Sequence, residues 1–563
     1  MDNVRIAVDV GGTFTDIALE HAEGMTTKKV LTTPDKPEEG VLSGIKSTLT
    51  EANISPSEIK ILIHGTTLAT NALIERKGAK VALITTEGLR DSVEMAQENR
   101  FEQYDINIDR PKPLVPRYLR WGIRERMNVN GEVLIQLEDK SIEQLLPMID
   151  KNQIEAIAIG LIHSYANSMH EEKIAERLSA ARPDLSITLS SQVCPEIREY
   201  ERQSTACANA YVQPLMSRYL TKLDEALQSM GFMCPFLLMT SGGGLTTLDT
   251  SIKFPVRLVE SGPAGGAILA TEIAKECGID NVLSFDMGGT TAKICLIDDY
   301  TPQMTRTFEV ARVYRNLKGS GLPLRIPAIE MVEIGAGGGS IAKVDDMKRI
   351  SVGPESSGAS PGPACYGQGG LDATVTDADV ILGRIDPKDF AGGAVKLAPE
   401  KADLVLQKAV GDQLSLDSSL SAFGVSEIVD ENMANAARVH AIEWGKDISA
   451  RSMIAFGGAA PLHALRLAEK LDINKVIIPA GAGVGSAIGF LRAPISYEVV
   501  RSRYMSLQYF DPDIVNELMK EMSEEAREIV TSGSDASELK EQRLAYMRYE
   551  GQGHEIVLSL IHI

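Results

Sequence analysis

Residues 9–16 read Asp-Val-Gly-Gly-Thr-Phe-Thr-Asp, and residues 286–293 repeat the pattern as Asp-Met-Gly-Gly-Thr-Thr-Ala-Lys. Apolar runs of strand composition precede both stretches, at 4–8 and 281–285, and similar runs follow them. Each unit is therefore strand, glycine turn and strand, whereas the common phosphate-binding loops lead from a strand into a helix. One Gly-Gly-Thr turn could simply close a hairpin, but two copies in matched surroundings predict a duplicated architecture.

The residues of both turns suit the binding of a triphosphate. Paired glycines let backbone N–H groups approach an anion without a Cβ in the way, and threonine hydroxyls add donors. The carboxylates of Asp9 and Asp286 would repel a phosphate, so we expect them to hold Mg²⁺, which then bridges to the phosphates. Two such hairpins facing each other would clamp a triphosphate from both sides. The turn residues expected to bind ATP are Gly11, Gly12, Thr13, Thr15, Gly288, Gly289, Thr290 and Thr291.

Strand and helix patterns alternate between the two copies, which predicts α/β sheets covered by helices. The run 156–162 is apolar throughout, as a strand covered on both faces should be, and 205–230 has a long helical pattern. Residues 91–132 depart from this alternation because they are rich in charge and carry three prolines. We expect them to form an inserted, largely irregular lobe.

Glycine clusters outside the two turns mark further candidates. Gly457 and Gly458 follow a short strand and precede a helix, which makes a natural floor for the ribose or base of adenosine. The run 262–266 opens an apolar helical stretch and could either present a helix N-terminus to an anion or serve tight packing. Residues 351–370 combine several glycines and prolines, and we expect a long ordered loop there.

Composition narrows the classes of protein that the chain can belong to. Its 563 residues correspond to about three or four domains, and a net charge of −20 argues against non-specific nucleic-acid binding. The longest uncharged apolar run, between Lys475 and Arg492, is shorter than the roughly 20 residues of a membrane helix. The N-terminus lacks a secretory pattern, and the cysteines show neither disulfide nor zinc spacing. We therefore expect a cytoplasmic protein without nucleic-acid or membrane partners.

Six runs of the chain, taken together, identify a family. They are Asp9–Asp16, His64–Thr67, Arg110–Arg117, Asp286–Lys293, Gly362–Gly370 and Phe456–Ala464. Together they resemble the hydantoinase A/5-oxoprolinase family, within the actin, sugar-kinase and heat-shock-chaperone ATPase superfamily. The resemblance implies two actin-like (ribonuclease H-like) ATPase halves, ATP and Mg²⁺ as cofactors, a small cyclic-amide substrate and a separate hydantoinase B-type subunit as partner.

The resemblance also sets the expected domains. Residues 1–200 should form an N-terminal hydantoinase A domain with the first actin-like half and the inserted lobe at 91–132. Residues 201–495 should form the core domain with the second half, and 496–563 the start of a C-terminal domain. Family members usually continue further, and residues 558–563 match the translation of a common sequencing adaptor. We therefore expect a truncated gene model whose last residues are not native; a natural short form is the alternative.

The implied activity is that of the large ATP-binding subunit of an ATP-dependent cyclic-amide hydrolase. ATP would phosphorylate the amide oxygen, with Asp9 and Asp286 as metal ligands and Lys293 beside the γ-phosphate; a surface lysine is the alternative for Lys293. His64 could orient the substrate or the transferred group, or it could be a structural histidine. Two other functions stay open: an ATP-using subunit of an acetone- or acetophenone-type carboxylase, and a non-enzymatic ATP-driven conformational module.

Overall fold

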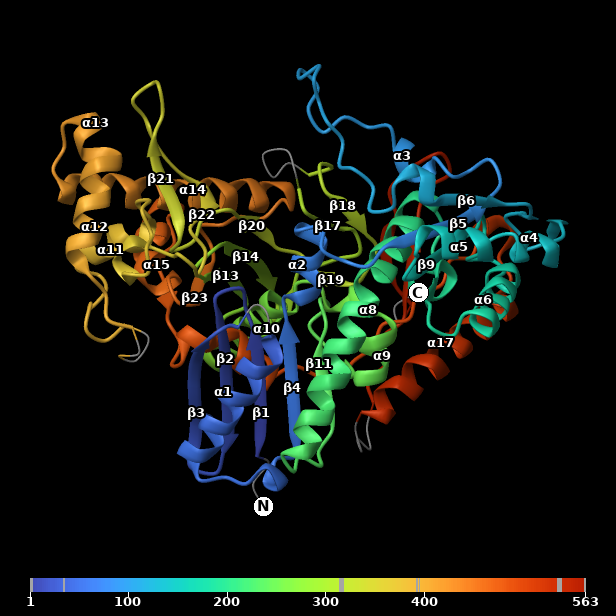
Figure 1. The fold of residues 1–563 in the computed structure, drawn as a ribbon, viewed down its shortest axis with the longest axis horizontal. Helices are drawn as coiled ribbons and strands as arrows, with labels where there is room; N and C mark the ends of the chain where they lie inside the picture. Colours follow the sequence, from blue (N-terminus) through green and yellow to red (C-terminus); the bar gives the residue numbers. More distant parts are fainter. Residues whose placement is uncertain are drawn as a thin grey trace.

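The computed structural model describes residues 4–33, 36–312, 318–390, 393, 395–533 and 539–560. Figure 1 shows a sheet at the bottom of the molecule and two lobes above it, one on each side. The last three residues of the segment 558–563, which the sequence suggests is not native, lie outside the described part of the chain.

The first hairpin begins the lower sheet. β1 (Arg5–Val10) and β2 (Phe14–His21) are antiparallel, and β4 (Ile61–Thr66) lies parallel to β1 on its other side. The strand order is β12-β11-β4-β1-β2-β3. The remaining strands are β3 (Gly24–Leu31), β11 (Phe236–Met239) and β12 (Leu245–Thr247). β11 and β12 come after residue 200, so the first sheet takes two of its strands from the segment 201–495.

The second hairpin begins an equivalent sheet. β13 (Asn281–Met287) and β14 (Ala292–Asp298) are antiparallel, and β23 (Ser452–Phe456) is parallel to β13. The order is β15-β14-β13-β23-β24, with β20 on β14. The short strands are β15 (Thr301–Pro302), β20 (Val332–Ile334) and β24 (Val476–Ile477). In both halves a parallel strand thus flanks the hairpin and leads into a helix, and the predicted duplication is confirmed.

A shared apolar layer joins the two sheets. It contains Ala7 and Ile63 from the first sheet, Val282 and Ile454 from the second, and the buried face of a central helix. That helix, α10 (Ser261–Cys277), and α16 (Gly485–Phe490) lie between the two halves. The other faces of the sheets are covered by α1 (Pro37–Ala52), α2 (Leu68–Ile74), α8 (Glu199–Ser229), α14 (Ser418–Glu443) and α15 (Ala460–Leu471).

A third sheet forms the right-hand lobe of Figure 1, beside the upper end of α8. Its order is β10-β9-β5-β6 and its strands are parallel. The strands are β5 (Val81–Thr86), β6 (Arg120–Ile123), β9 (Ala156–Gly160) and β10 (Ser186–Leu189). β6 lies within 91–132, so the expectation of a largely irregular insertion is wrong for that part, because its backbone pairs with β5. The helices of this lobe are α3 (Ser92–Met95), α4 (Asp139–Glu143), α5 (Leu146–Asn152) and α6 (Met169–Ala181).

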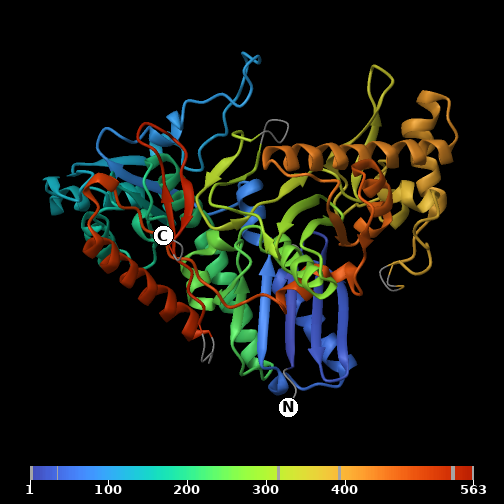
Figure 2. The same cartoon turned by 180° about the vertical axis from the view of Figure 1, so that it is seen from behind.

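The left-hand lobe of Figure 1 carries the helices that surround α14, which Figure 2 shows from behind. They include α11 (Val375–Ile381) and α12 (Pro399–Leu406). β21 (Ser340–Val344) pairs with β22 (Ile350–Ser356) in the same lobe. The expected loop at 351–370 is therefore a strand over its first residues.

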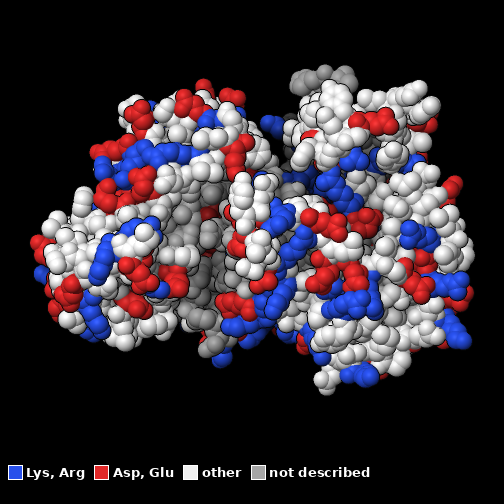
Figure 3. Space-filling view, turned by 90° about the horizontal axis from the view of Figure 1, so that it is seen from above, with Lys and Arg blue, Asp and Glu red and all other residues white. Residues whose placement is uncertain are grey.

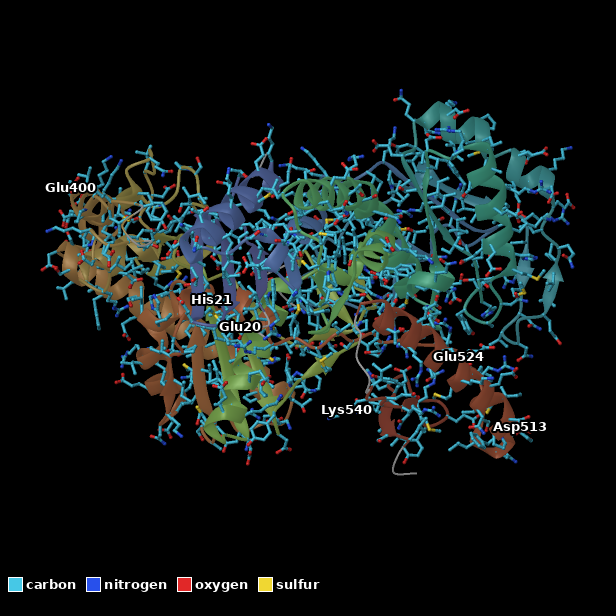
Figure 4. All side chains as sticks on the ribbon, turned by 90° about the horizontal axis from the view of Figure 1, so that it is seen from below. Glu20, His21, Glu400, Asp513, Glu524 and Lys540 are labelled. Carbon is cyan, nitrogen blue, oxygen red and sulfur yellow. The ribbon has the colours of Figure 1, made fainter. Side chains whose placement is uncertain are left out.

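The C-terminal part of the described chain lies at the periphery. In Figure 4, Asp513 and Glu524 mark α17 (Pro512–Ser532) at one edge, and Glu400 of α12 marks the opposite end. A hairpin of β25 (Leu544–Met547) and β26 (Ile556–Ser559) follows α17. Among the described residues, no helix is both long and apolar enough to cross a membrane.

Candidate functional site

The two glycine turns have the same internal geometry and face each other. Gly11 N donates to Phe14 O at 2.9 Å, and Gly288 N donates to Thr291 O at 3.1 Å, which is the same bond at equivalent positions. A methyl group on Gly289 would lie 3.5 Å from Thr13 Oγ1. The second turn therefore lies against the threonine of the first, as the clamp hypothesis requires.

The Asp9 carboxylate is buried at the end of β1, against the beginning of α10. A methyl group on Gly262 would lie 3.0 Å from Asp9 Oδ2, so any larger residue would crowd this carboxylate. Asp9 Oδ1 finds no hydrogen-bond partner in the described part of the chain. Burial raises the pKa of Asp9 to about 7, and the negative charges of Asp16 and Asp286 add to the shift. Among the described residues, Asp9 thus forms no ion pair, and the charges of Lys29 and Lys293 offset the rise of its pKa only in part.

Asp286 occupies the equivalent position in the second half. A methyl group on Gly457 would lie 2.4 Å from Asp286 Oδ1, and Gly457 has φ +98°, a conformation that favours glycine. Burial raises the pKa of Asp286 to about 6, although the nearby Lys293 ammonium lowers it. Gly457 therefore packs against the proposed metal ligand.

These two carboxylates suit a hard cation. Mg²⁺ commonly uses one or two protein carboxylates and completes its shell with water and phosphate oxygens. Asp9 Oδ1 is unpartnered, and the pKa of both aspartates is raised, so a cation beside them would compensate two closely placed carboxylates. Asp9 and Asp286 therefore fit the metal that the sequence predicts.

Lys293 lies opposite Asp286 in the β13–β14 register, and its ammonium is already paired. Lys293 Nζ lies 2.7 Å from Glu260 Oε2 and 3.5 Å from Glu333 Oε1. Both carboxylates raise the pKa of Lys293, so the side chain is charged. Its positive charge also lowers the pKa of both Asp9 and Asp286. Lys293 thus belongs to the site, and it enters as one member of an ion pair.

The comparisons with known proteins agree with this geometry. Residues 202–499 match the family model described as Hydantoinase/oxoprolinase, and residues 5–181 match the Hydantoinase/oxoprolinase N-terminal region. The chain belongs to the hydantoinase/oxoprolinase family.

Individual members show how close the likeness is. Caprolactamase subunit alpha of Pseudomonas jessenii is 33% identical over 99% of this chain and 80% of its own length. The crystal structure of ATP-dependent caprolactamase from the same organism matches with a TM-score of 0.84 at 31% identity, over 99% of this chain and 81% of that one. The nucleotide-free structure of acetone carboxylase matches with a TM-score of 0.81 at 26% identity, again over 99% and 81%. The predicted duplicated α/β fold is thus confirmed.

A glycine-rich strap completes the second turn of this hydantoinase/oxoprolinase family member. Gly338 N donates to Gly288 O at 3.1 Å, and Gly339 N donates to Gly289 O at 2.6 Å. The glycine cluster at 335–340 is visible in the sequence, but its contact with the second turn is not. These two bonds engage carbonyl groups of the turn, so the strap does not occupy the N–H group of Gly289.

The remaining turn residues divide into open and enclosed positions. No described atom lies within 4 Å of a methyl group built on Gly12, Gly288 or Gly458, which is the space a ligand needs. Thr15 is buried, and its hydroxyl lies 3.1 Å from that of Thr32. Its placement therefore favours support of the first turn over direct phosphate contact.

In the view from above, the surface is hollowed between the left-hand lobe and the centre, and both signs of charge are interspersed (Figure 3).

His64 lies on the other face of the first sheet from Asp9. It pairs with Val8 in the β1–β4 register, and neighbouring residues of a strand point to opposite faces. Its side chain is 0% exposed, and Nε2 lies 3.0 Å from the hydroxyl of Tyr219 on α8. Burial lowers the pKa of His64 to about 4, so the ring is neutral. The placement of His64 therefore favours the second of the two expected roles, that of a structural histidine.

Proposed function

We propose that this chain is the large ATP-binding subunit of an ATP-dependent cyclic-amide hydrolase of the hydantoinase/5-oxoprolinase type, which acts with a B-type partner subunit. The observation that carries the proposal is the pair of opposed hairpins, each with an aspartate at its base, between the two halves of the molecule. The family and the ATP-dependent caprolactamase relative support the reaction class.

The chemistry explains why such a hydrolase needs ATP. The ring nitrogen of a lactam or imide donates electrons into the carbonyl group, so the carbonyl carbon is a poor electrophile. Transfer of the γ-phosphoryl group to the carbonyl oxygen converts that oxygen into a leaving group, and water can then attack the carbon. Phosphoryl transfer depends mainly on positioning and on charge neutralisation, which the clamp is built to supply.

Each part of the site has a role in this proposal. The N–H groups of Gly12 and Gly289 and the hydroxyls of Thr13 and Thr290 would hold phosphate oxygens. Gly11 and Gly288 close the two turns through their own N–H groups, and Gly458 would lie beside adenosine. Asp9 and Asp286 would hold Mg²⁺, which when bound neutralises the charge that develops on the phosphates. The Lys293 ammonium keeps a positive charge at the base of the second turn.

The acetone carboxylase structure supports one alternative within the same site. An ATP-using carboxylase subunit would phosphorylate the oxygen of a ketone enol or of bicarbonate. The nucleotide clamp would be the same, because only the acceptor oxygen differs. A non-enzymatic ATP-driven module would show ATP binding without dependence on any acceptor.

The test is acceptor-dependent ATP cleavage by the full chain together with its B-type partner. The acceptors are 5-oxoproline, hydantoin, caprolactam, and acetone with bicarbonate, and released phosphate and ring-opened product are both measured. We expect a cyclic amide to stimulate ATP cleavage and to be opened in proportion. If acetone with bicarbonate stimulates ATP cleavage and no cyclic amide does, the result supports the carboxylase. If no acceptor stimulates ATP cleavage, the result contradicts both enzymatic functions.

Two variants tie that activity to the clamp. Asp9→Ala and Asp286→Ala should each abolish Mg²⁺-dependent ATP cleavage, since removal of a metal ligand costs several kcal/mol of transition-state stabilisation. Glu400→Ala, on the distant α12, serves as the control for a lost surface carboxylate. Circular dichroism must show that all three variants are folded.

A further inference from the structure

Glu260 adopts a conformation that is unusual for a residue with a side chain. It directly precedes α10, at φ +61°, in the left-handed region that favours glycine. Its backbone N–H donates to Thr70 Oγ1 of α2 at 3.2 Å. Such strain persists only where the surrounding structure enforces it, and it is concentrated at functional sites. The strained backbone therefore indicates a functional role for the Glu260 side chain.

The Glu260 carboxylate lies at the junction of the two halves. Oε2 is 2.7 Å from Lys293 Nζ, and the two side chains are 12% and 16% exposed. Lys293 is the register partner of Asp286, while Gly262, two residues after Glu260, packs against Asp9. The ion pair of Glu260 and Lys293 thus connects the two proposed metal ligands, and it keeps some access to solvent.

We propose that Glu260 is the general base that removes a proton from the substrate while its carbonyl oxygen is phosphorylated. This inference rests on the proposed function and names the base for it. The carbonyl oxygen forms a bond to the γ-phosphorus, and the bond from that phosphorus to the β–γ bridging oxygen breaks to release ADP. The N–H electron pair becomes the second bond of C=N, and the proton moves to the Glu260 carboxylate.

The same step describes a ketone acceptor. There the proton leaves the carbon next to the carbonyl group, and the C–H electron pair becomes the second bond of C=C. One carboxylate in this position therefore serves both reactions for which family members are named. Lys293 keeps Glu260 ionised before the reaction, and burial raises the pKa of Glu260, which favours the acceptance of a proton.

Other acidic groups of the described site are less suited to this role. Asp9 and Asp286 are the proposed ligands of Mg²⁺. Asp16 lies opposite Asp9 in the β1–β2 register, and its carboxylate is already paired with the Lys29 ammonium on β3. Glu333 is 53% exposed and lies 3.5 Å from Lys293, so it is the outer partner of the same lysine.

The test compares Glu260→Gln with Glu333→Gln in the full chain with its B-type partner. The substrates are the lactam that supports turnover and its N-methyl analogue, which has no N–H proton to lose. We expect Glu260→Gln to lower lactam-dependent ATP cleavage by about 100-fold or more, while the Kd for Mg-ATP and the melting temperature stay close to the wild-type values. Glu333→Gln should keep the rate within about threefold.

The ratio of the rate with the N–H lactam to the rate with the N-methyl lactam distinguishes a catalytic role of Glu260 from a purely structural one. Wild-type enzyme should prefer the N–H lactam, and Glu260→Gln should bring that ratio close to one because the base is gone. A full rate in Glu260→Gln overturns the proposal, and so does a reduced rate with an unchanged ratio, which indicates a structural ion pair. If Glu260→Gln fails to fold, Glu260→Asp keeps a carboxylate beside Lys293 at a changed distance. It should show a smaller loss of rate with a smaller fall in the ratio, and a loss of rate with an unchanged ratio would again overturn the proposal. Failure of every wild-type reaction would instead contradict the proposed function.

Discussion

Substitution of Gly457 by alanine should damage the site through a single added methyl group. That methyl group would lie 2.4 Å from Asp286 Oδ1 and 2.6 Å from Met287 O. To regain an ordinary contact of 3.4 Å, the Asp286 carboxylate must move by about 1 Å. A displacement of this size in a catalytic group typically costs about 100-fold in rate. The left-handed backbone at φ +98° adds roughly 1–2 kcal/mol of strain.

The assay is Mg²⁺-dependent ATP cleavage at saturating ATP, with thermal unfolding measured on the same samples. Gly445→Ala is the matched control: Gly445 has φ +62°, it is exposed, and no described atom lies within 4 Å of the added methyl group. Both variants should lose stability, and only Gly457→Ala should lose about 100-fold in rate. If Gly457→Ala cleaves ATP at the rate of Gly445→Ala, then Asp286 is not positioned for catalysis in the way described.

Three further predictions concern buried titratable groups. The pKa of Asp9 in the folded protein, about 7, lies above its ordinary value of 3.8, so the ionisation of Asp9 lowers the stability of the fold as pH rises between those values. Without nucleotide, Asp9→Asn should therefore be more stable than wild type at pH 8, by up to about 4 kcal/mol. An equal difference in stability at pH 4 would refute this. Tyr219→Phe should remove the hydrogen bond to His64 and lower the free energy of unfolding, measured by chemical denaturation, by about 1 kcal/mol. ATP cleavage per folded molecule should stay unchanged, and a specific loss of activity would instead support a catalytic role for His64. His463 lies between Asp430, at 2.7 Å, and Asp379, at 3.2 Å, and its pKa is raised to about 9. The stability it supplies is fully present below its ordinary pKa of 6.5 and is lost as pH rises through 9, so the wild type should lose more unfolding free energy than His463→Gln between pH 7 and 10.

The duplicated hairpins could be predicted because their information is local. Each consists of adjacent apolar runs around a glycine turn, and the repeat of Asp9 at Asp286 reveals the symmetry. The third sheet was harder to predict. β6 reads Arg-Trp-Gly-Ile, which is too short and too polar to stand out from the charged segment around it. Its identity as a strand comes from pairing with β5, and such long-range pairing leaves no local pattern.

The site shows the same division between local and long-range information. The residue types of the two turns follow from the sequence, but the role of His64 depends on register. Once His64 is aligned with Val8, the alternation of side chains along a strand places it on the face of the sheet opposite Asp9. Glu260 did carry a local signal, since it is an acidic residue in the apolar segment before Gly262. Its partner Lys293 comes 33 residues later, so only the folded chain brings the ion pair together.

A crystal structure of the chain with a Mg²⁺ complex of a non-hydrolysable ATP analogue tests the central claim most directly. The clamp predicts that the β- and γ-phosphates lie between the turns at Gly11–Thr13 and Gly288–Thr290, with the metal next to the carboxylates of Asp9 and Asp286. Gly458 should then lie beside the adenosine. A nucleotide bound elsewhere, or one contacted by a single hairpin, would contradict the account.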